Sequence, residues 1–334
     1  MARVHFLNVG NGDCSIIEHN SGRVTMIDIC GGNTNEILKK AEATPFEALV
    51  PSTQPSGNYG MRRRPTNPIE YMKRNGIGRP FRFILTHPDC DHLDGFDALC
   101  EEFGMVNFWD NGLRREKPGF DGSRYKEEDW DRYEDVRDVK RYGLTVVRHL
   151  AGSKFTFANQ GDPEERGDCL DIVAPDAALV KKANETEDPN DGSYVIVYRS
   201  AGGKIVFGGD GHNSTFDYIL KHNSSAVSNC AVLIAPHHGR DSYRSHDFLD
   251  TLKPGLTLFG CAESEHLAYD QYNRRGLLKI TNNQAGNVVM EPRSEGIDIF
   301  VENKKFAQTF SSCDLNRLCC GCYYIGFVPA PSAS

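Results

Sequence analysis

The segment LTHPDCDHLDG, residues 85–95, places two histidines and three aspartates directly after an apolar run. His87, Asp89, Asp91 and His92 follow one another at spacings i, i+2, i+4 and i+5. Imidazole and carboxylate groups are the ligands that Zn²⁺ and Mn²⁺ take in proteins. Four such groups on one turn repel each other or lose solvation unless a cation joins them. The segment therefore predicts a metal site.

Four further apolar segments are also followed by polar residues: VTMIDICGG, KIVFGGDGH, AVLIAPHHGR and LTLFGCAESEH. They place Asp28, Asp210, His237, His238 and His266 where strands are expected to end. A single histidine at a strand end is more often a hydrogen-bonded structural residue, so the interpretation depends on the whole set meeting. In α/β folds, functional groups gather at the carboxyl ends of strands. If these side chains converge, they supply enough ligands for two divalent ions, which can ionise a shared water without a serine or cysteine nucleophile.

The elements that must position these residues alternate along the chain. Alternation of strands and helices predicts a layered α/β domain with sheets inside and helices outside. Strands are expected at 3–9, 14–18, 23–29, 81–86, 144–149, 170–173, 193–199, 203–208, 230–235, 256–260, 287–291 and 297–301, and helices at 34–43, 67–76, 93–103, 214–221 and 245–252. Residues 110–143 are charge-rich and are expected to form a partly helical insertion.

Composition narrows the class of protein. The 334 residues are 39% hydrophobic and 25% charged, and no apolar run approaches the roughly 20 residues that span a bilayer. The first residues lack the apolar core of a signal peptide, so we expect a cytoplasmic protein without a membrane role. The eleven cysteines are an odd number, which argues against a complete disulfide framework.

The charge balance bears on the substrate. A net charge of −8 disfavours a broad basic face for duplex nucleic acid. A local basic patch at Arg62–Arg64, Lys73, Arg74, Arg79 and Arg82 is interpreted equally well as a solvated surface or as an anion site.

The order of these motifs resembles the metallo-β-lactamase fold superfamily. Within it, the sequence is most similar to the hydrolase domain of ComEC-type DNA-uptake proteins and their soluble stand-alone relatives. The matching segments, over roughly residues 3–300, are VGNGD, IDICGG, THPDCDHLDG, NDGSYVIVYRSAGGKIVFGGD, the HHG tract, ESEHLAYDQYNRRG and ITNNQAGNVVME. The resemblance implies a four-layer αββα sandwich over residues 1–301, with a cysteine-containing C-terminal extension at 302–334.

The resemblance also implies a role for each matching residue. His87 and Asp89 would bind a first divalent ion, and Asp91 and His92 would bind a second. Asp210 would bridge the two ions. The ions would be Zn²⁺ or Mn²⁺, with Mg²⁺ as a further candidate.

Other residues would surround this pair of ions. His237 would join the second ion. His238 and His266 would lie beside the ions and, with Asp91, act as the catalytic groups that contact substrate or supply a proton. Asp28 would orient the ligands from behind. The remaining residues expected behind the ligands or at the substrate are Asp13, Asn190, Ser193 and Arg240.

Two departures from the wider superfamily concern the first ion. Asp89 stands where histidine is commoner, and the sequence DPNDGS offers Asn190, Asp191 and Ser193 where a ligand histidine is usual. Both changes replace nitrogen by oxygen. We expect the first site to be weaker, to prefer Mn²⁺, or to fill only when substrate is present. In the tail, CDLNRLCCGC lacks the two separated CxxC pairs of a strong zinc module, so a reduced, partly buried segment is expected.

The implied function is metal-dependent hydrolysis by a metal-bound hydroxide. A phosphodiester is the expected substrate, in single-stranded nucleic acid or a nucleotide, which suits the acidic net charge. Two alternatives stay open: hydrolysis of a lactone, thioester or amide, and a non-catalytic nucleotide-sensing or protein-assembly module with a degraded site. A protein partner is compatible with either, and the sequence leaves the oligomeric state open.

Overall fold

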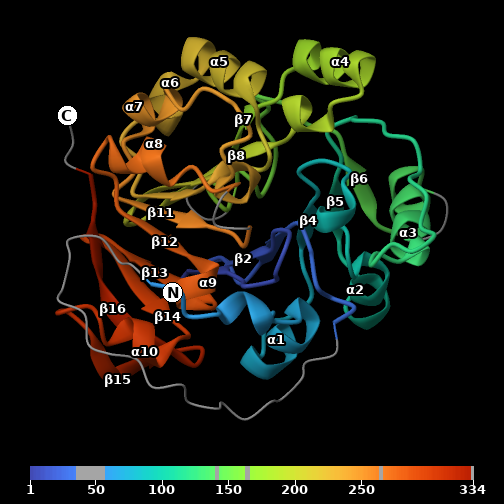
Figure 1. Cartoon of the computed structure of the whole chain (residues 1–334). Helices are drawn as coiled ribbons and strands as arrows, with labels where there is room; N and C mark the ends of the chain where they lie inside the picture. The colour runs from blue at the N-terminus through green and yellow to red at the C-terminus, as the bar shows by residue number, and fades with distance from the viewer. Residues whose placement is uncertain (35–56, 140–142, 162–165, 263–265, 332–334) are drawn as a thin grey trace.

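Two β-sheets form the centre of the molecule. The computed structural model describes residues 1–34, 57–139, 143–161, 166–262 and 266–331. Within them a ten-stranded sheet has the order β15-β16-β14-β13-β1-β2-β3-β4-β5-β6, and a six-stranded sheet has the order β12-β11-β10-β9-β8-β7 (Figure 1).

The elements have the following bounds. The larger sheet contains β1 (Arg3–Phe6), β2 (Ser15–Glu18), β3 (Val24–Ile27), β4 (Arg82–Ile84), β5 (Asn107–Trp109), β6 (Thr145–Val147), β13 (Val288–Arg293), β14 (Gly296–Val301), β15 (Asp314–Cys319) and β16 (Cys322–Pro329). The smaller sheet contains β7 (Leu170–Ala174), β8 (Val195–Ser200), β9 (Gly203–Phe207), β10 (Val232–Ile234), β11 (Leu256–Phe259) and β12 (Lys279–Thr281). The α-helices are α1 (Pro68–Asn75), α2 (Phe96–Glu102), α3 (Glu127–Arg137), α4 (Ala177–Thr186), α5 (Asn213–His222), α6 (Ser224–Val227), α7 (Phe248–Leu252), α8 (Tyr269–Asn273), α9 (Asn282–Ala285) and α10 (Lys304–Ala307).

Three apolar clusters separate the layers. Side chains alternate between the two faces of a strand, so Ile84 of β4 joins the cluster between the sheets while Phe83 joins the cluster under α1, α2 and α3. In the smaller sheet, Ile205 faces the larger sheet while Val206 packs with residues of α5 and α7. The expected αββα sandwich is therefore confirmed.

Parallel strands bring the predicted ligands to the carboxyl edges of the two sheets. Strands β3 to β6 pair in parallel, and so do β9 to β12. Asp28 follows β3 and His87 follows β4, so both stand at the carboxyl end of the larger sheet. Asp210 and His237 follow β9 and β10 in the smaller sheet. Two sheet edges thus supply one site.

Local sequence signals fix the helix that supports this edge. The side chain of Asn67 accepts hydrogen bonds from the backbone N–H groups of Ile69 and Glu70, and Pro68 takes the first helical position. Gly76 ends α1 at φ 65°, a conformation that glycine adopts without strain. The expected helix at 34–43 lies, apart from Thr34, outside the described residues.

The C-terminal residues continue the larger sheet. Strand β16 pairs antiparallel with β14, and β15 pairs with β16 at the sheet edge. The cysteines of the described chain are free thiols, and none of the potential metal-ligand groups found there includes a cysteine. The elements missing from the sequence-based expectation were helices α4, α6, α8, α9 and α10 and strands β5, β12, β15 and β16.

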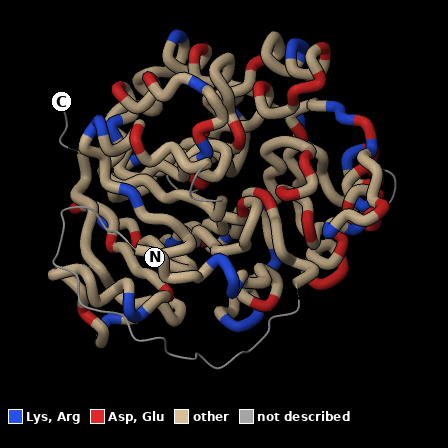
Figure 2. Tube along the Cα trace, viewed as in Figure 1, with Lys and Arg blue, Asp and Glu red and all other residues tan. Residues whose placement is uncertain are grey.

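The predicted basic patch divides between surface and core. Arg82 is only 1% exposed, and its guanidinium binds Thr25 Oγ1 and lies 2.7 Å from Asp168 Oδ2. It is therefore part of the core, which contradicts its placement in a patch. Figure 2 shows basic and acidic residues interspersed along the described chain. None of the helices formed by the described residues is both long and apolar enough to cross a membrane.

Candidate metal centre

Six side chains from both sheets meet in one buried cluster. Their potential ligand atoms form three overlapping groups, and within each group all atoms lie within 4.8 Å of one another. His92, Asp210 and His238 each belong to two groups, which makes the cluster continuous. The groups are His87, His92 and Asp210; Asp91, His92 and His238; and Asp13, Asp210 and His238.

Asp210 lies at the centre of the cluster. Its Oδ1 is 3.5 Å from Nε2 of His92, and its Oδ2 is 3.9 Å from Nε2 of His87 and 3.8 Å from Nε2 of His238. These distances are too long for hydrogen bonds. Ligand atoms about 2.1 Å from a tetrahedral zinc ion lie about 3.4 Å apart. The spacing therefore suits groups that share a cation better than groups that bond to each other.

The buried polar atoms of the cluster test whether such an ion fits. Nε2 of His87, Nε2 of His92, Oδ1 of Asp210 and both ring nitrogens of His238 find no hydrogen-bond partner among the residues the structure describes. Oδ1 of Asp13 is also unsatisfied, because its 3.1 Å contact with Nδ1 of His238 is not aligned as a hydrogen bond. Buried polar atoms in native proteins nearly always have a partner. The residues present therefore fit a bound divalent cation.

Asp28 fixes the orientation of His92 from behind the cluster. Its Oδ2 accepts a hydrogen bond from Nδ1 of His92 at 2.8 Å, and the same carboxylate accepts two from the hydroxyl and backbone N–H of Thr86. With a proton held on Nδ1, Nε2 faces Asp210 and is the ring nitrogen left for a metal ion. This is the carboxylate–histidine arrangement that supports metal ligands.

Charge in the cluster favours a cation at its centre. Burial by itself lowers the pKa of His92, but the carboxylates of Asp210 and Asp28 outweigh burial and raise that pKa well above the ordinary value. In the same way, Asp13 and Asp210 overcome burial and raise the pKa of His238 to about 10. Carboxylates thus dominate the field, and a divalent ion would relieve their repulsion.

Two histidines are held neutral instead. Burial lowers the pKa of His87, and the nearby charge of His92 lowers it further. Burial also lowers the pKa of His237 to about 3, against the opposing attraction of Asp210. A neutral imidazole keeps the lone pair that a metal ion requires.

The turn after β10 presents two adjacent histidines in different directions. His237 and His238 have φ values of 53° and 58°, in the left-handed region that costs free energy outside glycine. His238 enters the cluster between Asp13 and Asp91. His237 lies at the rim, where its Nε2 is 3.7 Å from Asp210 Oδ2 and its Nδ1 is 2.9 Å from the hydroxyl of Ser242. The structure thus brings His238, rather than His237, into the ligand groups.

Asp89 and His266 lie outside these groups. Asp89 forms an ion pair with Arg115, and its Oδ2 is 3.8 Å from Nε2 of His87. His266 is exposed, and its backbone carbonyl accepts a hydrogen bond from the N–H of Asp241.

The other predicted residues surround the cluster. The hydroxyl of Ser193 accepts a hydrogen bond from the backbone N–H of Asp210 at 3.0 Å. Within the described part of the chain, Oδ1 of Asn190 and Nε of Arg240 are buried without a hydrogen-bond partner. Both atoms lack the partner that buried polar groups normally have.

Sequence reasoning missed two residues of the surroundings. Nε2 of His212 lies 3.4 Å from Nδ1 of His237, and its position directly after GGDG is the signal that could have found it. Arg244 is buried, and its guanidinium donates to the carbonyls of Gly211, Pro236 and Arg240. It ties together the two loops that carry Asp210 and His238.

Replacing Asp28 by asparagine is expected to weaken metal binding by roughly 10- to 100-fold. The amide keeps the size of the side chain but loses the charge that holds the proton on Nδ1 of His92. Calorimetric titration of the metal-stripped protein with Zn²⁺ measures the effect. Asp176→Asn, at the N-cap of α4, is the matched control. Equal affinities for both variants would contradict the role given to Asp28.

Comparison with known proteins gives structural similarity only. No family model matches the chain, and no curated protein matches its sequence. Igni18, described as a novel metallo hydrolase from the hyperthermophilic archaeon Ignicoccus hospitalis, is 12% identical with a TM-score of 0.48, over 87% of this chain and 100% of its own. Tm1679, a metal-dependent hydrolase of the β-lactamase superfamily, is 16% identical with a TM-score of 0.44, over 84% and 96%.

A diphosphatase from the PhnP family is 13% identical with a TM-score of 0.41, over 84% of this chain and 95% of its own.

Proposed function

We propose that this chain is a metal-dependent hydrolase that cleaves phosphodiesters in single-stranded nucleic acid or nucleotides. The observation that carries the proposal is the buried cluster of His87, His92, Asp210 and His238, whose facing atoms lack hydrogen-bond partners within the described residues. A divalent ion bound there would lower the pKa of a water molecule and stabilise developing negative charge.

The side chains of the cluster divide into ligands and proton carriers. Asp91, His92 and Asp210 would hold the ion. His238 lies between two carboxylates, with Nδ1 3.1 Å from Asp13 and Nε2 3.4 Å from Asp91. This arrangement allows the imidazole of His238 to hold a proton close to the reacting group and to transfer it to the leaving oxygen.

Arg240 supports an anionic substrate. It directly follows the PHHG turn, and its buried Nε has no hydrogen-bond partner within the described chain. A guanidinium that lacks a partner and lies two residues after His238 in the sequence is suited to bind phosphate oxygens. The order of motifs, which is similar to that of ComEC-type proteins, supports nucleic acid as the source of that phosphate.

Replacing Arg240 by methionine is expected to lower kcat/KM for a phosphodiester by roughly 10- to 100-fold, the value of a lost charge-assisted hydrogen bond. Metal affinity should stay unchanged, because Arg240 belongs to none of the ligand groups. Steady-state kinetics together with a metal titration separate the two effects. A variant with unaltered kcat/KM would remove Arg240 from substrate binding.

The proposal itself is tested with metal-stripped protein reloaded with Mn²⁺, Zn²⁺ or Mg²⁺. Substrates are single-stranded DNA, duplex DNA, RNA, bis-p-nitrophenyl phosphate and, as carbonyl substrates, a lactone and a thioester. The Asp91→Ala, His92→Ala double variant is the control. Phosphodiester hydrolysis by the wild type alone is expected. Equal rates for both proteins would refute the proposal, and hydrolysis of only the carbonyl substrates would replace it.

A further inference from the structure

An arginine of the insertion pairs with an aspartate that lies next to the metal cluster. The guanidinium of Arg115 pairs with the carboxylate of Asp89, the residue that the motif order assigns to a first ion. The other oxygen of Asp89 faces His87 Nε2 at 3.8 Å. Asp89 belongs to none of the ligand groups formed by the described residues, and those groups are concentrated around His92, Asp210 and His238.

The backbone leading to Arg115 is anchored to the metal site itself. The side-chain amide of Asn111 donates hydrogen bonds to the carbonyls of Thr86 and Gly192, at 2.8 and 3.0 Å. Thr86 directly precedes His87. Leu113 is 1% exposed and packs so closely on Gly192 that a Cβ there would lie 2.6 Å from its Cδ2. Arg115 is therefore held over the cluster by its own segment.

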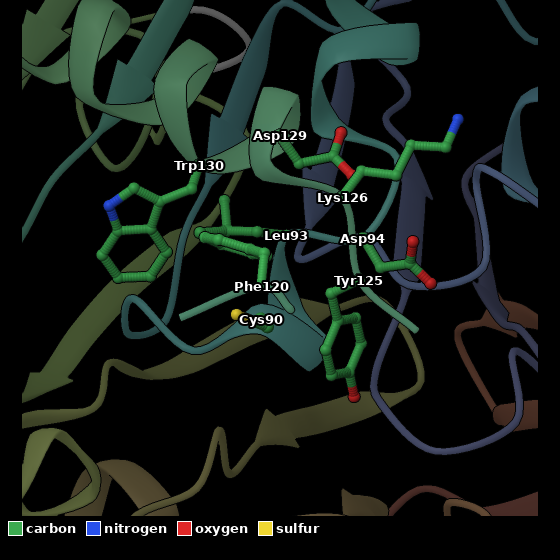
Figure 3. A pocket seen from close by; sticks show the side chains of 8 residues that line it. All are labelled: Cys90, Leu93, Asp94, Phe120, Tyr125, Lys126, Asp129 and Trp130. Atoms are coloured by element: carbon green, nitrogen blue, oxygen red, sulfur yellow. The ribbon is translucent and has the colours of Figure 1, made fainter. Parts of the chain in front are cut away.

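The rest of the insertion is seated on the same loop. Phe120, Tyr125 and Trp130 line a small cavity with Cys90 and Leu93, which flank Asp91 and His92 in the sequence (Figure 3). Lys117 pairs with Glu127 and Asp131 of α3. The segment that carries Arg115 is thus fixed at both ends, which makes the position of its guanidinium a built feature of the fold.

We propose that Arg115 takes the place of the first metal ion, so that the chain binds one divalent ion tightly, around Asp91, His92 and Asp210, and a second one only weakly. The inference rests on the metal centre of the proposed function and deepens it. A guanidinium remains protonated at all accessible pH values and matches a carboxylate with two donors. It neutralises Asp89 and repels a divalent ion that approaches His87 and Asp89.

The expected difference in affinity between the two ions follows from the solvent exposure of Arg115 and Asp89. The side chains of Arg115 and Asp89 are 39% and 25% exposed, so water screens their attraction and a second ion can still compete. We expect that ion to bind at least about tenfold more weakly than the first. Arg115 is also accessible to a substrate phosphate, which would leave a single ion and a guanidinium to share the substrate charge.

The test is metal stoichiometry, measured by calorimetric titration of metal-stripped full-length protein with Mn²⁺ and by the electron paramagnetic resonance signal of the product. Wild type should show one tight ion and the six-line spectrum of isolated Mn²⁺. Arg115→Met should bring the second affinity to within a few fold of the first and produce the spectrum of a coupled pair. Arg115→Lys keeps a cation and should resemble wild type. Arg114→Met is the matched control, because Asp110, the partner of Arg114, retains Arg148.

Two equally tight ions in wild type would overturn the inference, as would an Arg115→Met variant that leaves the second affinity unchanged. A circular dichroism melting curve for each variant shows whether it is folded, and the wild-type spectrum alone still decides if Arg115→Met fails to fold. The expected metal pattern without phosphodiester hydrolysis would refute the proposed function and leave the metal assignment standing.

Discussion

Replacing Asp210 by asparagine is expected to lower metal affinity and hydrolysis together, each by at least about 1,000-fold, beyond the roughly 10- to 100-fold effect of residues behind the ligands. Asp210 is the one side chain whose carboxylate faces His87, His92, His237 and His238 within 4 Å among the described residues. The amide removes the charge that these imidazoles share with an ion. It also leaves the remaining buried ligands with no anion at their centre.

Calorimetric titration with Zn²⁺ and a bis-p-nitrophenyl phosphate assay measure the two losses. Asp171→Asn is the matched control, because Asp171 is a paired carboxylate of the same sheet that binds Arg199 and Lys154 away from the cluster. An Asp210→Asn protein that binds metal like the control would remove Asp210 from the ligand set. If the variant binds metal normally but loses activity, Asp210 takes part in the reaction and not in metal binding.

Replacing Asp168 by asparagine is expected to lower the free energy of unfolding by about 3–5 kcal/mol. Oδ2 of Asp168 lies 2.7 Å from the guanidinium of Arg82 and 2.8 Å from that of Arg23, and Oδ1 accepts a hydrogen bond from Ser21. Arg82 is almost completely buried, so the variant leaves an uncompensated charge in the core. Urea unfolding at pH 7 measures the change. The pair of Arg275 and the exposed Asp250 is the control, and Asp250→Asn should cost at most about 1 kcal/mol.

The contacts of Asp168 also predict how the stability of the fold changes with pH. Burial alone would raise the pKa of Asp168, but hydrogen bonding to Arg23 and the charges of His19 and Arg82 hold it below 3.8. A carboxyl group whose pKa is lower in the folded state stabilises the fold above the unfolded pKa, and this stabilisation disappears as pH falls through the folded value. Wild type should therefore lose the contribution of Asp168 below about pH 4. An identical loss in Asp168→Asn would show that other carboxyl groups cause it.

The sequence was sufficient to predict the sandwich and most of its strands, because apolar periodicity and turn residues are local signals. It also predicted that His87, His92 and Asp210 would meet, because functional groups in α/β folds gather at the carboxyl ends of strands. The two adjacent histidines could not be assigned in this way. Which of them enters the cluster depends on the left-handed backbone at His237 and His238, and this backbone is set by packing around the turn.

Long-range charge pairing explains the other differences. Arg82 was placed in a surface patch because arginine is rarely buried, but its partner Asp168 lies far along the chain. Asp89 was expected to bind metal because its motif is local, whereas Arg115 comes from an insertion with no periodic pattern. Ion pairs of this kind form only in the tertiary structure. The sequence around one partner therefore does not predict the other.

The pairing of β1 with β13 determines when the larger sheet can be completed during synthesis. Val4 lies opposite Met290, so one edge of β1 stays unpaired until a strand far along the chain has been synthesised. Until then the ribosome-bound chain exposes backbone donors and acceptors that can pair with another nascent chain. Such non-local closure also favours slow folding. We therefore expect the yield of recombinant protein to be limited by aggregation of the nascent chain, and not by low stability of the folded state.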